Sequence, residues 1–113
     1  MTLIYKILPR AAWEAAQAKG VFAGSEVDLR DGFIHFSGGG QADETARRYF
    51  AGQADLMVLV VKAEPLGEAL KWEPSRGGGL FPHLYAPLRC ADVIEARAAP
   101  LDAGGLPDLG ELE

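Results

Sequence analysis

The residues best suited to chemistry are the two histidines of the chain, each of which lies in a short aromatic segment. His35 belongs to Asp-Gly-Phe-Ile-His-Phe-Ser at residues 31–37, whose composition favours a strand after a turn. Because side chains alternate along a strand, we expect His35 and Ser37 on one face with Phe33. A titratable ring beside a hydroxyl, followed by three glycines, suits a ligand site. The structural alternative is a histidine hydrogen-bonded inside a core.

The second histidine, His83, follows a proline in Phe-Pro-His-Leu-Tyr at residues 81–85. Pro82 fixes its own φ and favours an extended conformation for the residue before it, so we expect a stiff backbone here. His83 and Tyr85 point the same way if the segment is extended, and both polar rings need hydrogen-bond partners if they are buried. The two rings either line a cleft or fill the corner of a core.

A carboxylate and a guanidinium precede the second glycine run, at Glu73 and Arg76. The glycines at 77–79 allow the backbone to approach a ligand closely, so Arg76 is predicted to hold a phosphate or a carboxylate. The run lacks the spacing of a nucleotide-triphosphate loop and of the dinucleotide fingerprint. Glu73 is interpreted either as a catalytic carboxylate or as the partner of a surface base.

Several other chemistries are disfavoured by the residues present. The single cysteine, Cys90, excludes an intrachain disulfide and a site with several cysteine ligands. The two histidines lack the helical HExxH spacing, which disfavours a zinc site, although the fold could still bring His35, His83 and Glu73 together. No serine lies in the Gly-x-Ser-x-Gly turn of a serine hydrolase. A net charge of −5 without a basic run argues against binding to bulk nucleic acid.

The chain is 113 residues long, the size of one domain that buries its own core. We expect a single folded unit over residues 1–98 and an acidic tail rich in glycine and proline over 99–113. No apolar run approaches the length of a membrane span and no signal peptide pattern opens the chain. We therefore expect a cytoplasmic protein without a membrane partner.

The elements that must position the histidines follow from the hydrophobic pattern. The alanine-rich segment 10–19 and the segment 41–51 favour helices, and 21–30 keeps no period and is predicted as a loop. Strands are expected at 3–8, 33–37, 56–61, 70–73 and 93–97, with a glycine loop running into a further strand over 77–85. Two helices near the front and several strands after them predict an α+β fold.

The order of these segments resembles a small family of bacterial proteins known only as a domain of unknown function. The matching segments lie at residues 4–7, 13–16, 31–37, 49–59, 72–73 and 78–85. That family resembles the ADP-ribosyltransferase-like proteins in fold, which bind NAD in a cleft between two small antiparallel sheets. Its front third is similar to the RNA 2′-phosphotransferase branch, where a strand with histidine and serine two residues apart contacts NAD and phosphate. The resemblance implies that His35 and Ser37 face such a cleft.

One position departs from the resemblance. Lys6 stands where this family and the transferases often carry a first-strand histidine, which in the transferases holds the ribose of NAD. A lysine can hold an anionic group as a point charge, but it cannot stack as a ring does. NAD is therefore a candidate cofactor, but the lysine at this position argues against NAD binding.

Two functions remain open from the sequence. In the first, the cleft binds a nucleotide or another small anionic ligand and can act as a transferase. The catalytic candidates are then His35, His83 and Glu73, and the ligand-binding candidates are Lys6, Ser37, Thr45, Arg76 and Tyr85. In the second, a non-catalytic binding or interaction module keeps the scaffold without the chemistry. The lysine at position 6 favours the second function, and the paired histidines with Arg76 favour the first.

Overall fold

The computed structural model describes residues 1–113, apart from the side chain of Arg76. The helices are α1 (Arg10–Lys19), α2 (Glu26–Asp31) and α3 (Ala42–Tyr49), and short 3₁₀ turns are η1 (Glu64–Ala69), η2 (Arg76–Gly78) and η3 (Cys90–Asp92). The strands are β1 (Leu3–Pro9), β2 (Val21–Phe22), β3 (Ile34–His35), β4 (Ser37–Gly38), β5 (Leu56–Lys62), β6 (Leu70–Pro74), β7 (Leu80–Leu84), β8 (Leu88–Arg89) and β9 (Val93–Ala99).

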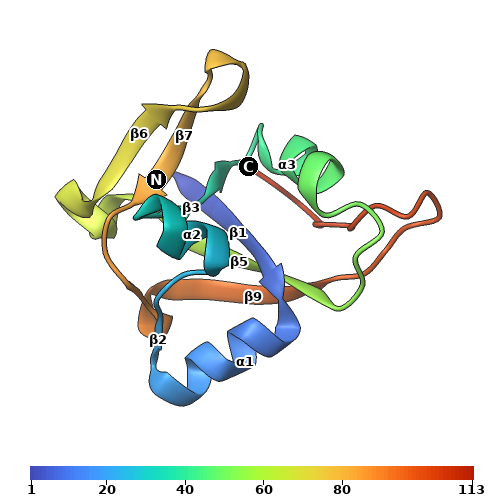
Figure 1. The fold of residues 1–113 in the computed structure, drawn as a ribbon, viewed down its shortest axis with the longest axis horizontal. Helices are drawn as coiled ribbons and strands as arrows, with labels where there is room; N and C mark the ends of the chain where they lie inside the picture. Colours follow the sequence, from blue (N-terminus) through green and yellow to red (C-terminus); the bar gives the residue numbers. More distant parts are fainter.

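The strands form small antiparallel sheets. The largest has the order β4-β1-β5-β9, a second has the order β3-β7-β6, and β2 pairs with β8. Figure 1 shows the hairpin of β6 and β7 rising away from the four-stranded sheet, with α1 and α3 at different sides of it. The prediction of an α+β fold with small antiparallel sheets is confirmed.

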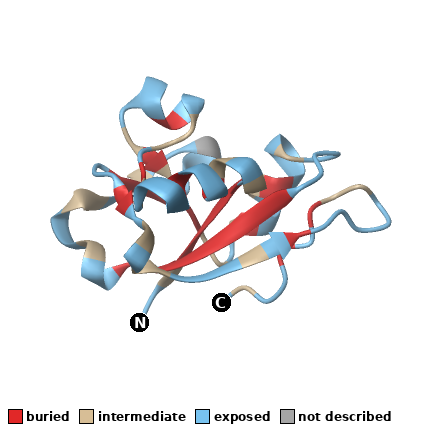
Figure 2. Ribbon diagram, turned by 90° about the horizontal axis from the view of Figure 1, so that it is seen from below, coloured by how far each residue is buried: buried red, intermediate tan, exposed pale blue. Residues whose placement is uncertain are grey.

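The core lies on both faces of the four-stranded sheet. Residues 56–61 of β5 are all buried, as the continuous hydrophobic run predicts, and Figure 2 shows buried residues concentrated in the central strands. One face packs against α1 and the residues of β3 and β7, and the other against α3 and the tail. In β1, Ile4 and Leu8 belong to the first cluster, while Tyr5 and Ile7 belong to the second. Lys6, between them, therefore lies on the face that meets the three-stranded sheet.

The prediction of a loop over 21–30 is wrong, because this segment contains the short strand β2 and the helix α2. Ser25 caps this helix reciprocally with Asp28, whose carboxylate accepts the backbone N–H of Ser25 at 2.8 Å. Gly32 ends the helix with a left-handed φ of 89°. A helix of 6 residues is too short to show a hydrophobic period, so only its capping residues marked it in the sequence.

The prediction of one continuous strand over 33–37 is also wrong. His35 in β3 pairs with β7, whereas Ser37 in β4 pairs with Tyr5 of β1 in the other sheet. Phe36 lies between them, with its side chain buried and its backbone N–H donating to the carbonyl of Pro82 at 3.0 Å. The chain thus crosses from the three-stranded to the four-stranded sheet at Phe36, because the buried ring holds the crossing in the core.

The remaining elements differ from the expected ones mainly at their ends. The helix expected over 41–51 spans Ala42–Tyr49, and the strand expected within 77–85 begins at Leu80. After β9 the chain forms no further helix or strand in the described structure, yet Leu109 is buried against the sheet. Arg97 Nη1 donates to the carbonyl of Leu109 at 2.9 Å and holds this segment on β9. In the part of the chain that is described, no helix combines the length and apolarity that crossing a bilayer requires.

Candidate functional site

A cavity of about 660 Å³ lies where the sheets meet. Its walls come from β1, α2, the β3–β4 crossing, α3 and β7. The polar side chains that line it include Lys6, Asp28, Asp31, His35, Ser37 and His83. Pockets for small organic ligands typically measure about 300–1,000 Å³, so this cavity has room for a molecule of nucleoside size.

A buried ion pair joins the first strand to the short helix beside the cavity. Lys6 Nζ lies 3.1 Å from Oδ1 and 3.0 Å from Oδ2 of Asp28. Both side chains are buried, with relative exposures of 8% and 2%. Lys6 was predicted to bind an anionic ligand, and the structure shows it already paired with a carboxylate of its own chain.

Asp28 is the centre of the polar network. Burial by itself raises the pKa of its carboxyl group, but the hydrogen bond from His35 and the charge of Lys6 outweigh burial. Backbone N–H groups of Ser25 and His35 also donate to this carboxylate, at 2.8 Å and 3.1 Å. The pKa of Asp28 therefore lies well below its usual range, and the group is an anion at neutral pH.

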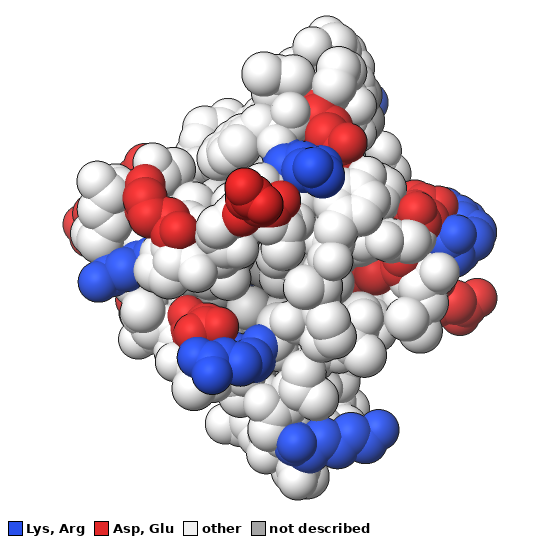
Figure 3. All heavy atoms as spheres, turned by 90° about the vertical axis from the view of Figure 1, so that its left-hand side faces the viewer, with Lys and Arg blue, Asp and Glu red and all other residues white. Residues whose placement is uncertain are grey.

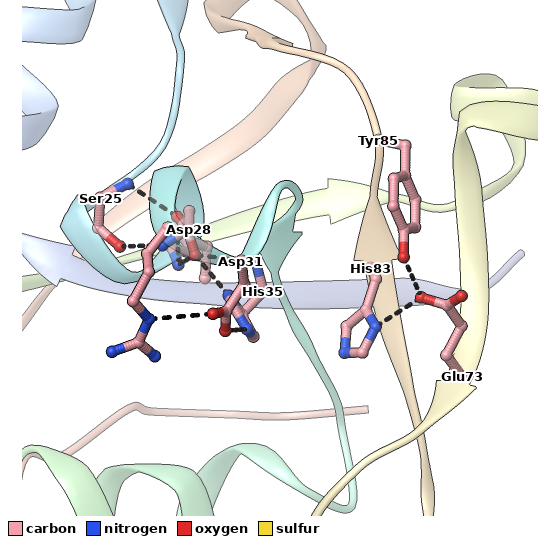
Figure 4. A network of polar contacts seen from close by, with 9 residues as sticks. Ser25, Asp28, Asp31, His35, Glu73, His83 and Tyr85 are labelled. Carbon is pink, nitrogen blue, oxygen red and sulfur yellow. Dashed lines mark hydrogen bonds and ion pairs between the residues drawn. The ribbon is translucent and has the colours of Figure 1, made fainter.

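The ring of His35 lies between two carboxylates. Its Nδ1 is 2.7 Å from Asp28 Oδ1, and its Nε2 is 3.1 Å from Asp31 Oδ2 (Figure 4). The side chain is about a third exposed, at 32%, and it lines the cavity. Helix α2 supplies both carboxylates, and the turn at Gly32 places them beside the ring on β3.

The ring of His83 is held by a single carboxylate. Its Nδ1 lies 2.8 Å from Glu73 Oε1, and Tyr85 donates its hydroxyl to the same oxygen at 2.7 Å (Figure 4). These hydrogen bonds lower the pKa of Glu73, and the bond to Glu73 raises the pKa of Tyr85. His83 is buried and lines the cavity, and its hydrogen-bonded partners are Glu73 of β6 and, through Glu73, Tyr85 just after β7.

The two histidines are direct partners in the sheet. His35 and His83 are paired residues of β3 and β7, and their ring centroids lie 5.5 Å apart. Phe33 contacts both rings, stacking on His83 at 4.1 Å and lying 4.5 Å from His35. Two imidazoles that are 48 positions apart in the sequence therefore line one cavity.

The other predicted site residues are distributed around this pair. Ser37 Oγ and Thr45 Oγ1 are 2.9 Å apart, and both residues line the cavity from the side of β4 and α3. The side chain of Arg76 lies outside the described part of the structure. The structure thus brings Lys6, His35, Ser37, Thr45 and His83 to one cavity and places Glu73 and Tyr85 behind His83.

Sequence reasoning missed the carboxylates that orient the site. Asp28 hydrogen-bonds the ring of His35 and Asp31 lies within ion-pair distance of it, yet neither was a predicted site residue. The available signal was the pattern Gly-Ser-x-x-Asp at 24–28, which is typical of a capping box. That pattern indicates a helix start, but it does not reveal that the capping carboxylate also meets a lysine from β1.

The described basic side chains that line the cavity are each paired with a carboxylate. Lys6 pairs with Asp28, and Arg30 Nε lies 3.1 Å from Asp31 Oδ1. On the face of the molecule seen in Figure 3, acidic and basic side chains are interspersed and no broad basic patch covers it. Neither described cation of the cavity wall is therefore left without a carboxylate partner.

Comparisons with known proteins agree with the fold. Residues 7–96 match a family model described as "Protein of unknown function (DUF952)". The crystal structure of protein CC0527 from Caulobacter crescentus shares 62% identity with a TM-score of 0.92, and the match covers 94% of this chain and 93% of that chain. The solution NMR structure of CC0527 shares 63% identity with a TM-score of 0.88, covering 97% and 95%. No curated protein matches the chain.

Proposed function

The chain belongs to the DUF952 family of proteins of unknown function, and from its site we propose that it binds a nucleotide or NAD-like ligand. On this proposal the scaffold is ADP-ribosyltransferase-like, and the ligand occupies the cleft between the two small sheets. The observation that carries the proposal is the crossing of the chain at Phe36. It places His35 on one sheet and Ser37 on the other, with both side chains in the same cavity.

The lining of the cavity indicates which part of a nucleotide it would hold. Lys6 is buried and already paired with Asp28, so the deep part of the cavity offers little to a phosphate group. Carboxylates and hydroxyls, such as Asp31 and Ser37, instead suit the hydroxyl groups of a ribose. We therefore place the nucleoside inside the cleft and its phosphates toward solvent.

A direct test is calorimetric titration of the full chain with NAD, ADP-ribose and adenosine. Thr45→Val removes a hydroxyl that lines the cavity without changing the side-chain shape, and it should weaken binding about tenfold, as expected for one lost hydrogen bond. The matched control is Thr2→Val, at an exposed position outside the cavity, which should leave the affinity unchanged. No saturable heat with any of the three ligands would contradict the proposal.

A non-catalytic binding module is the second candidate, and one observation favours it. Lys6 stands where the resemblance implies that a first-strand histidine is often found, and its ammonium group is paired with Asp28 rather than presented to a ligand. Binding without any chemical change of the ligand after prolonged incubation, monitored by chromatography, would support this candidate. Conversion of the ligand would exclude it.

A further inference from the structure

Helix α2 has an inverted distribution of buried and exposed side chains. Asp28 is the only buried residue of this fully described helix, whereas Val27 is 46% exposed and Leu29 is 66% exposed. A surface helix is normally held on a protein by a stripe of buried apolar side chains. In α2 the large apolar side chains contribute little to that attachment, and the residue directed into the protein is a carboxylate.

The contacts of Asp28 are therefore the main attachment of α2. Its carboxylate contacts the ammonium group of Lys6 on β1, and it accepts hydrogen bonds from the ring and the backbone N–H of His35 on β3. A buried ion pair contributes little net stability when the alternative is two hydrated ions. Lifting of α2 would hydrate Asp28 and Lys6 together, so this attachment can open without exposing an apolar core.

The helix is flanked by two glycines in the left-handed region. Gly24 has a φ of +126° and Gly32 has a φ of +89°. Glycine changes between left-handed and right-handed conformations more readily than other residues, so both positions suit a hinge. The capping bonds between Ser25 and Asp28 lie between the two glycines, so α2 can move as one unit with its cap.

Helix α2 also borders two cavities. Val27 lines the main cavity of about 660 Å³, whereas Leu29 lines a second cavity of about 240 Å³ together with Phe33 and Tyr85. Asp28 is the one described residue that lines both cavities. Movement of this side chain would therefore connect them.

We propose that α2 is a lid on the main cavity, hinged at Gly24 and Gly32 and latched by the carboxylate of Asp28. In the closed state, which the structure shows, Asp28 pairs with Lys6 and separates the two cavities. In the open state α2 lifts while the sheets stay folded, the cavities join, and the ammonium group of Lys6 meets solvent. The lid is a property of the chain alone, and only its use as the entrance for a ligand rests on the proposed function.

The lid can be detected in the full chain by native-state hydrogen exchange, measured with NMR at pH 7. The amides of Gly32 and Phe33 donate to the carbonyl of Asp28 at 2.8 Å and 3.2 Å, so they report the opening of α2. The amides of Val58 and Val60 in the central strand β5 report global unfolding. The α2 amides should exchange about 100-fold faster or more, and dilute urea should not change their rate, because lid opening exposes little surface. Exchange in β5 should accelerate steeply with urea.

Amine labelling distinguishes movement of the whole helix from fraying of its ends. Lys6 is only 7% exposed, whereas Lys71 is exposed and serves as the internal standard. Brief treatment with N-hydroxysuccinimidyl acetate, followed by mass spectrometry, should show slow acetylation of Lys6 at a rate that dilute urea does not change. Fraying of the helix ends would leave Lys6 paired with Asp28, so acetylation of Lys6 only upon global unfolding would overturn the lid.

Three variants separate the latch from global stability. Leu109→Ala removes a buried side chain on the opposite face of the four-stranded sheet, so it should speed exchange in β5 about 30-fold or more and leave both α2 exchange and Lys6 acetylation unchanged. Asp28→Asn removes the latch and should speed α2 exchange and Lys6 acetylation about 30-fold or more. Glu26→Gln, at an exposed position of the same helix, is the matched control and should change them less than about fivefold.

The results bear separately on the lid and on its ligand. Equal rates and equal urea dependence in α2 and β5, or equal acceleration of the two by Leu109→Ala, would overturn the lid whether or not a nucleotide binds. Unchanged α2 exchange in Asp28→Asn would overturn the latch. If the lid is detected but calorimetry shows no binding of a nucleotide, the proposed ligand is wrong and the lid remains.

Discussion

At the scale of single residues, the site depends on Asp28 more than on either histidine. One carboxylate contacts Lys6, the ring and backbone of His35, and the backbone of Ser25. Four donors from three segments of the chain therefore converge on one buried anion. Removing that anion leaves Lys6 as a buried and unpaired cation, which is more costly than the loss of an exposed ion pair.

Replacement of this carboxylate gives the first prediction. Asp28→Asn should lower the free energy of unfolding by about 3–5 kcal/mol, measured by urea denaturation. The control is Asp55→Asn, whose side chain is 70% exposed and pairs with Arg10, and its effect should stay below about 1 kcal/mol. Equal effects of the two substitutions would show that Lys6 finds another partner or is neutral.

The same carboxylate predicts how stability depends on pH. The pKa of Asp28 is lower in the folded chain than the usual value of 3.8 for an aspartate, so the unfolded chain binds its proton more readily. Its contribution is complete above about pH 5 and decreases as the pH falls through 4 and below. Unfolding free energies between pH 7 and pH 3 should therefore decline more steeply for the unmodified chain than for Asp28→Asn. Parallel curves would contradict this assignment.

The hydrogen bond between Glu73 and Tyr85 can be tested through the pKa of Tyr85. The hydrogen bond to Glu73 raises the pKa of Tyr85, so Glu73→Gln should lower that pKa toward its usual value of 10.0. Alkaline titration of the absorbance at 295 nm, compared with Tyr85→Phe to identify the transition, measures this change. Glu64→Gln, which alters a carboxylate that accepts from the backbone of Thr2, serves as the control and should leave the titration unchanged.

At the scale of elements, the decisive feature is the short path from α2 through β3 to β4. Gly32 ends α2 in a left-handed conformation and directs the chain into β3, and Phe36 then transfers it to the other sheet. This path brings the carboxylates of α2, the ring of His35 and the hydroxyl of Ser37 to one cavity. The first step depends on the left-handed conformation of Gly32, and the second depends on the buried ring of Phe36.

The conformation of Gly32 gives a prediction at this scale. An alanine methyl at Gly32 would meet no atom within 4 Å, but the φ of +89° is unfavourable for alanine. Gly32→Ala should therefore cost about 1–2 kcal/mol of unfolding free energy. Gly40→Ala is the matched control, because its site is equally open and its φ is not in this region. Equal stability of the two variants in urea would contradict the assigned backbone conformation.

The sequence predicted the long elements well because their signals are local. The alanine-rich pattern marked α1 from Arg10 to Lys19, and the hydrophobic run at 56–61 marked the buried strand β5. It missed α2, whose 6 residues carry only a cap, and it joined β3 to β4 because alternation does not tell which sheet a strand enters. The role of Asp28 was missed because its partner Lys6 lies 22 positions away, and a local pattern does not show contacts over that distance.

At the scale of the whole molecule, the four-stranded sheet is buried on both faces. Residues of this sheet and of the three-stranded sheet line one cavity. One face packs against β3 and β7, and the other packs against α3 and the tail, where Leu109 is buried. The similar protein CC0527, at 62% identity and a TM-score of 0.92, has the same architecture. A ligand in the cavity would therefore contact both sheets, and its binding should change the surroundings of both β1 and β7.

The most direct test of the account is therefore a backbone amide NMR titration of the full chain with ADP-ribose. The account predicts saturable shifts in three separate segments that wall the cavity, in β1 around Lys6, in 25–37 and in β7 around His83. Shifts confined to residues outside the cavity wall, or no shifts at millimolar ligand, would contradict it.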